Sequence, residues 1–299
     1  MKFNLYSAFA IFIVISNSLK AQNKLAYELA IGEQFMVHQI ADQVITQDMK
    51  AHKHEMSNRL ESDFLFTVEN ANDSLYTLNF TYDRFKMESS SNLLEQIISI
   101  NTEENLTSTA IQNKIFAQIL NVNLTMTMYK NGKIKSVTGS DKLISKMINV
   151  LGDVDDLTKE VMKESMKKEF GNKSLALSLE QMTYIYPNTS VQIGDSWTNT
   201  FTGELSSTNT WTLKSITQDD INITGVSSVS FKTSDADMDM ILNGDMTSFI
   251  KTSASTGFAK IMTTTSVVKG YSLMHTENNL KAPTTITSNI TYKIEKHVQ

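Results

Sequence analysis

Two sets of side chains in this sequence have residue types and a spacing that metal ions use. The first is His52 and His54, which are two positions apart, so on a β-strand both imidazole rings would project from one face. A zinc ion needs three or four protein ligands, and the neighbouring acid, Glu55, would point to the opposite face. We therefore interpret the two histidines as part of a solvated strand face, with metal binding as the weaker alternative.

The second set is Asp235, Asp237 and Asp239, because calcium sites use alternate carboxylates as oxygen ligands. An EF-hand loop that begins at Asp235 requires Gly and Glu where this sequence has Met240 and Met246. Strand alternation explains the pattern more simply, since apolar side chains occupy the intervening positions. We predict no metal and no cofactor, and keep weak surface calcium binding as an alternative.

A third pattern, Gly194-Asp195-Ser196-Trp197, resembles the Gly-Asp-Ser block of an esterase and lipase family in which the serine is the nucleophile. In that family the base and its orienting acid come from an Asp-x-x-His motif, and no histidine of this sequence has Asp three positions before it. The block also leads into alternating strand residues rather than a helix. We predict a turn here, no catalytic residues and a protein that is not an enzyme, with a secreted hydrolase as the alternative.

The first 21 residues have the organisation of a secretory signal peptide. Lys2 precedes an uncharged stretch from Leu5 to Ile15, and a polar segment then closes on Ala21. The apolar stretch is about half the length that spans a bilayer, and no later apolar run approaches that length. We expect cleavage before Gln22 and a soluble mature chain without a transmembrane segment, located in the periplasm or outside the cell.

Composition excludes several classes of protein. The chain has 299 residues, 40% apolar and 20% charged, with 11 Gly, 2 Pro and no Cys, which is typical of a globular protein stabilised by its core rather than by disulfides. Removing Lys2 and Lys20 from 27 basic residues leaves 25 against 32 acidic ones, a net charge of −7. Nucleic acid is therefore not expected as a partner, because phosphate binding requires a basic surface.

The period of the apolar residues changes twice along the chain. Strand alternation is clearest in residues 74–87, and Asn131-Gly132 between residues 124–128 and 134–137 predicts a β-hairpin. Helical spacing follows, with Ser140 placed to cap a first helix and Gly152 to end it, then helices over 155–170 and 174–184 and a shorter one near 107–120. From Trp197 onward the strand period returns.

The order of strands, helices and strands predicts an α+β fold, predominantly antiparallel sheet in two β-rich halves. We divide the chain into a signal peptide (1–21), an N-terminal β-rich unit (22–139), a helical segment (140–186) and a C-terminal β-rich unit (187–299). Long strands with one apolar face, covered by amphipathic helices, suggest curved half-barrel sheets whose architecture resembles that of periplasmic lipoprotein carriers.

Three segments carry a family resemblance. They are Ile31-Gly32-Glu33-Gln34-Phe35, the stretch from Phe116 to Gly139 around Tyr-Lys-Asn-Gly-Lys-Ile, and Pro187 to Trp197 with its Ile-Gly-Asp-Ser-Trp. With them the chain resembles secreted Bacteroidota proteins of the domain-of-unknown-function family DUF6263. The resemblance implies an exported envelope protein of unknown activity. The similar Ile-Gly-acid-polar-aromatic pentapeptides also suggest either a duplicated β unit or two unrelated turns that lead into strands.

We expect an exported, non-enzymatic envelope protein that binds an apolar small molecule or lipid, or an envelope partner; its oligomeric state stays open. Flexible methionines and the wide helical stripe suit such a ligand, although both also fill ordinary cores. The candidate ligand-facing residues are Met126, Met128, Leu143, Met147, Ile148 and Leu151. Ser74, in Asp73-Ser74-Leu75, fits the acidic-hydroxyl-aliphatic tripeptide that is O-glycosylated in exported Bacteroidota proteins.

Overall fold

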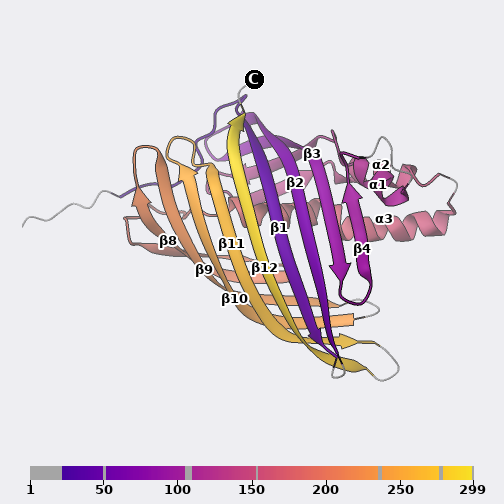
Figure 1. Cartoon of the computed structure of the whole chain (residues 1–299). Helices are drawn as coiled ribbons and strands as arrows, with labels where there is room; N and C mark the ends of the chain where they lie inside the picture. Colours follow the sequence, from indigo (N-terminus) through magenta and orange to yellow (C-terminus); the bar gives the residue numbers. More distant parts are fainter. Residues whose placement is uncertain are drawn as a thin grey trace, which may run out of the picture.

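The computed structural model describes residues 22–49, 52–104, 110–152, 154–234, 238–275 and 279–297. Most of them lie in one large, curved, open antiparallel sheet with four helices on one of its faces (Figure 1). The helices are α1 (Ile111–Ala117), α2 (Ser140–Asn149), α3 (Asp156–Phe170) and α4 (Asn172–Thr183). The strands are β1 (Gln34–Asp48), β2 (Lys53–Ala71), β3 (Leu75–Ser91), β4 (Glu95–Asn101), β5 (Leu124–Tyr129), β6 (Ile134–Thr138), β7 (Ser196–Phe201), β8 (Leu205–Ile216), β9 (Asp220–Ser234), β10 (Met238–Ser253), β11 (Ala259–Met274) and β12 (Leu280–His297). The predicted α+β class with predominantly antiparallel sheet is confirmed.

The two β-rich units form one continuous sheet. Its order is β6-β5-β3-β2-β1-β12-β11-β10-β9-β8-β7, with β4 paired to β3. The chain therefore starts at the centre of the sheet and proceeds to one edge. It then crosses through the helical segment to the other edge and returns strand by strand, until β12 pairs with β1 in the middle (Figure 1).

Alternation decides which side of each strand is buried. Along β1 and β2, Val37 and Phe64 point to the helical side and are almost completely buried, whereas their neighbours His38 and Asp63 point to the other side. We call the helical side the inner face and the opposite side the outer face. The largest core cluster lies between the inner face of the sheet and the helices, and it continues onto β8 to β12 through residues such as Trp211, Met262 and Tyr292.

An extended segment, residues 22–30, closes one end of this core. Tyr27 is buried; its backbone N–H donates to the carbonyl of Lys130 in the β5–β6 turn, and its hydroxyl donates to the carbonyl of Thr183 at the end of α4. Its ring packs edge-on against Tyr186 and Phe258. The segment thus joins the hairpin turn, the last helix and the β10–β11 connection.

The repeated pentapeptide forms the same turn twice. Before β1, the Glu33 carboxylate accepts from the N–H of Ala30 at 2.8 Å, and Gly32 has φ +86°. Before β7, the Asp195 carboxylate accepts from the N–H of Gln192 at 2.8 Å, and Gly194 has φ +96°. Each glycine N–H also donates to the neighbouring strand, so the shared motif encodes a turn that starts a strand.

Several boundaries differ from the sequence expectation. Ser140 is not the N-cap of α2: Gly139 occupies that position with φ +101°, and Ser140 lies buried inside the helix. The cap of α3 is Asp155, whose carboxylate accepts from the N–H of Thr158. Leu157, in the first turn of α3, is 75% exposed, because the helix packs against the core through Met162, Met166 and Phe170. Among the described residues, no helix combines the length and apolar character needed to cross a bilayer.

Candidate ligand groove

An open groove lies on the inner face of the C-terminal half of the sheet, beside the core that the helices cover. Its cavity volume is about 180 Å³, and the groove opens to solvent. Strands β7 to β12 form its floor, Gln43 of β1 closes one side, and Gln181 of α4 contributes to the wall. The groove exists because the helices cover only part of the inner face.

Apolar side chains form most of the lining. They are Phe201, Leu205, Trp211, Val229, Phe231, Met246, Met262, Val268, Ile286, Ile290 and Tyr292. Trp211 is held in place by its indole N–H, which donates to the Asn199 side chain at 3.0 Å, and its ring lies over Gly225, where a Cβ would be 2.5 Å from the ring. The hydrogen bond and the close packing on Gly225 therefore fix the position of the Trp211 ring in the groove floor.

The remaining lining residues are polar and uncharged: Gln43, Gln181, Ser207, Ser248, Thr264, Ser266 and Ser288. Among the described residues, no Asp, Glu, His, Lys or Arg lines this groove. Tyr292 does not supply a charge either, since burial raises the pKa of its phenol. A bound molecule would thus meet hydrocarbon, hydroxyl and amide groups without a counter-ion.

Three of the polar groups of the groove, Gln43, Ser266 and Ser288, belong to a row that crosses the sheet. Consecutive strands place one inner-face residue each in register, and we call this set the polar row: Asn199, Asn209, Ser227, Met246, Ser266, Ser288, Gln43, Asn58 and Ser89. All but Met246 carry a hydroxyl or an amide. The row separates the main core from a second apolar cluster of Val229, Leu242, Val268 and Ile286.

Hydrogen bonds within the polar row occur at its two ends. At one end Ser89 donates to Asn58, which donates to the amide oxygen of Gln43 at 3.0 Å. At the other end Asn209 donates to Asn199 at 2.8 Å. In between, the buried Ser227 hydroxyl has no hydrogen-bond partner among the described residues.

The six residues predicted to face a ligand lie outside this groove. Met126, Met128, Leu143 and Met147 are fully buried in the main core, Ile148 is 8% exposed, and Leu151 packs against the same cluster. The helical stripe therefore contributes to the covered core, and the candidate ligand surface moves to the half of the sheet that the helices leave open. Met246 and Met262 are the methionines that line it.

The candidate metal ligands are dispersed. His52 precedes β2, and His54 within it lies 3.1 Å from both Gln47 and Ser91. Asp235 and Asp237 lie outside the described residues, and Asp239 pairs with His275 at 3.1 Å. Within the described ranges, no three acidic or histidine side chains form a group that could hold a metal ion.

The two candidate hydroxyl groups are both exposed. Ser196 begins strand β7, as the turn interpretation expects, and its hydroxyl lies 2.8 Å from that of Thr212. Ser74 lies in the turn between β2 and β3, where its backbone N–H donates to Asn72. Its glycosylation stays a prediction.

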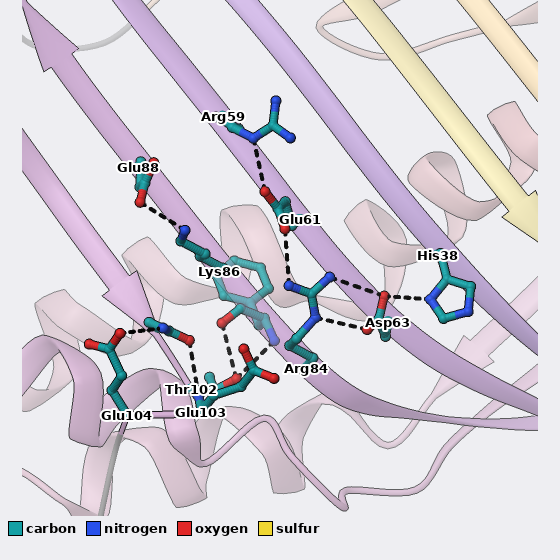
Figure 2. Close-up of polar contacts among 12 residues, drawn as sticks. His38, Arg59, Glu61, Asp63, Arg84, Lys86, Glu88, Thr102, Glu103 and Glu104 are labelled. Carbon is teal, nitrogen blue, oxygen red and sulfur yellow. Dashed lines mark hydrogen bonds and ion pairs between the residues drawn. The ribbon is translucent and has the colours of Figure 1, made fainter. Parts of the chain in front are cut away.

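The densest charge cluster lies on the outer face of β1, β2 and β3, away from the groove. Arg84 donates to Glu61 at 3.0 Å and to Asp63 at 2.8 Å, and Asp63 also contacts His38 at 2.9 Å (Figure 2). Glu61 in turn accepts from Arg59. Positive and negative groups alternate along this ladder, so it has no excess charge with which to attract a charged ligand, and we assign it a structural role.

Acid should weaken this ladder. Hydrogen bonds from Arg59 and Arg84 hold the pKa of Glu61 below its usual range. Burial would raise the pKa of Asp63, but hydrogen bonds from Arg84 and His38 keep it low as well. A carboxyl whose folded pKa is depressed stabilises the fold above its unfolded pKa, near 4, and loses that contribution as the pH falls through the folded value.

We therefore expect Arg84→Met to lower the free energy of unfolding by about 1–2 kcal/mol at pH 7, and the deficit to shrink as the pH falls below about 4. Urea unfolding from pH 3 to 7 measures this. The control is Lys167→Met, which removes the exposed pair with Glu164 on α3 and should change stability by less than about 0.5 kcal/mol. A deficit that is constant with pH would contradict the role given to the two carboxylates.

The geometry defines an open, curved antiparallel sheet with an uncharged apolar groove on its inner face. The sequence profile of a family described as "Family of unknown function (DUF6263)" matches residues 73–259, and the chain belongs to this family. No curated protein sequence matches the chain.

Among solved structures, the chain is similar to lipovitellin, in a structure titled for its lipid-protein interactions. The TM-score is 0.52 and the identity 8%, over 91% of this chain, which spans only 26% of the lipovitellin chain. This likeness shows the fold. An outer membrane channel from Pseudomonas putida F1 is more distant, with a TM-score of 0.26 and 8% identity over 90% of this chain and 98% of the channel.

Proposed function

We propose that this protein is an exported, non-enzymatic envelope protein that binds an apolar or amphipathic small molecule in the groove. The observation that carries the proposal is an apolar, uncharged surface that remains open on a sheet face whose other half is covered by helices. Ligand pockets are typically lined by apolar side chains with a few polar groups, and the lining of this groove has that composition.

Two further observations support the proposal. Lipovitellin, in a structure titled for its lipid-protein interactions, is similar in fold to this chain. The signal-like residues 1–21 immediately precede the segment 22–30 that packs on the core, so cleavage before Gln22 would leave that segment intact. The described residues of the groove supply hydrocarbon, hydroxyl and amide groups, a composition that suits binding of an uncharged molecule.

Filling the groove should abolish binding without unfolding the protein. Ser266 is half-buried on the groove floor, whereas its neighbour Thr265 projects from the outer face of the same strand. We expect Ser266→Phe to weaken binding of an apolar fluorescent dye at least tenfold, because the ring occupies the space that the dye needs. Thr265→Phe should bind the dye like the unmodified protein.

Dye titration and thermal melting of both variants measure this prediction. Native mass spectrometry of protein purified without detergent adds a direct readout, since a bound lipid should be present in Thr265→Phe and absent in Ser266→Phe. Equal dye affinity in the two variants would show that the groove is not the binding site.

A further inference from the structure

The polar row crosses the groove floor at the point where its side chains are not paired with one another. Ser266 of β11 and Ser288 of β12 face each other in register, and Gln43 of β1 comes next. Apolar side chains lie on both sides of this strip: Met262 and Tyr292 toward the core, and Val268 and Ile286 toward the second cluster. The floor is therefore apolar, then polar, then apolar.

We propose that the groove selects an uncharged amphiphile, with a hydroxyl, ester or amide group placed against Ser266, Ser288 and Gln43 and its hydrocarbon part on the apolar walls. The proposal rests on the function proposed above and adds the class of ligand. The occupant that the chemistry fits is a neutral lipid, rather than a fatty acid anion or a pure hydrocarbon.

The absence of charge in the lining argues against an ionic ligand. A carboxylate or ammonium group placed on this floor would lose its hydration and gain no counter-ion in return, because the described lining residues are all uncharged. The charged ladder of Arg59, Glu61, Asp63 and Arg84 projects from the opposite face and is paired within itself. Charged amphiphiles should therefore bind more weakly than neutral ones of equal chain length.

The polar row argues against a pure hydrocarbon. Covering hydroxyl groups with an alkane removes water from them and returns no hydrogen bond. Gln43 also has a defined orientation, since its amide oxygen accepts from Asn58 and leaves its N–H groups to donate. Ser227, one strand beyond Met246, is also buried without a hydrogen-bond partner among the described residues, although it does not itself line the groove. A ligand with oxygen atoms at this level fits the unpaired donors.

Competition with the apolar dye tests the proposal on the full mature chain. The probes are monolaurin, with a neutral polar group, laurate, with a carboxylate, and dodecane, with no polar group; all three share one chain length. They are used at pH 8, monolaurin and laurate below their micellar concentrations and dodecane below its solubility limit. We expect monolaurin to compete about tenfold more strongly than laurate or dodecane. Exchanging Ser266→Ala together with Ser288→Ala should remove that advantage and leave dodecane unchanged. The control pair, Thr265→Ala with Thr287→Ala, changes the outer face and should behave like the unmodified protein.

A charge placed in the row gives the sharper readout. Ser288→Lys should invert the order, so that laurate competes better than monolaurin, because the new ammonium group pairs with the carboxylate. Equal competition by all three probes, or strongest competition by laurate in the unmodified protein, would overturn the selectivity while leaving the groove as a binding site. If the unmodified protein does not bind the dye at all, the proposed function itself fails.

Discussion

Met147→Asp is expected to lower the free energy of unfolding by about 3–5 kcal/mol, or to prevent folding at 37 °C. Met147 is completely buried between α2 and the sheet, so an aspartate there would be an unpaired charge in an apolar core, or would become neutral through a raised pKa. Either way the site loses the packing of the methionine side chain. Urea unfolding measures the loss.

The matched control is Ser145→Asp, which adds the same charge to the exposed face of the same helix. It should change the free energy of unfolding by less than about 0.5 kcal/mol. Because the groove lies on another part of the sheet, Met147→Asp protein that still folds should retain dye binding. A stable Met147→Asp variant that loses dye binding would instead show that α2 is a movable lid over a ligand.

Gly132→Ala is expected to have an effect of similar size, by a different mechanism. Gly132 has φ +92° in the β5–β6 turn, and an added Cβ would lie 1.8 Å from the carbonyl oxygen of Thr183 and 2.8 Å from the ring of Tyr27. The backbone is strained by any side chain at this φ, and the overlap must also separate the hairpin from α4 and from the segment 22–30. We expect a loss of at least about 3 kcal/mol, measured by urea unfolding.

Gly152→Ala distinguishes the cost of backbone strain at positive φ from the cost of steric overlap between the added Cβ and neighbouring atoms. Gly152 also has a positive φ, +66°, but no atom lies within 4 Å of its added Cβ. Its variant should lose only about 1 kcal/mol, the usual penalty for a non-glycine residue in this backbone region. If both variants lose the same amount, the three-way contact at Gly132 contributes nothing.

Local pattern predicted most of the elements. The alternation in residues 74–87 became β3, the Asn131-Gly132 turn joins β5 and β6, and the periodic segments of 140–186 became α2, α3 and α4. The boundaries were less accurate where tertiary contacts decide them. Strand β3 extends from Leu75 to Ser91, beyond the alternation of residues 74–87, because β2 and β4 on its two sides supply hydrogen bonds to its last residues.

The groove was not predictable in the same way. Its residues come from seven strands and one helix, and the register that brings Ser266 beside Ser288 is a long-range property. A weak signal was present within single strands. Ser288 lies between the apolar residues Ile286 and Ile290 on the same face of β12, and Ser248 lies two positions after Met246 on the same face of β10. Such hydroxyl groups on a buried face indicate either a hydrogen-bond partner within the protein or a ligand. Only the order and register of the strands show that the hydroxyl groups of neighbouring strands lie side by side.

The pairing of β1 with β12 also has a consequence for how the chain folds. Glu33 and Lys296, which form an ion pair beside this pairing, are 263 positions apart, so the centre of the sheet is built from its most distant segments. Closing so long a loop is entropically demanding, and topologies dominated by such contacts fold slowly. Until β12 arrives, β1 has one hydrogen-bonding edge unpaired, and exposed strand edges are sites of aggregation. The final strand therefore completes the sheet at its middle, and the time that β12 needs to reach β1 determines how long that edge remains open.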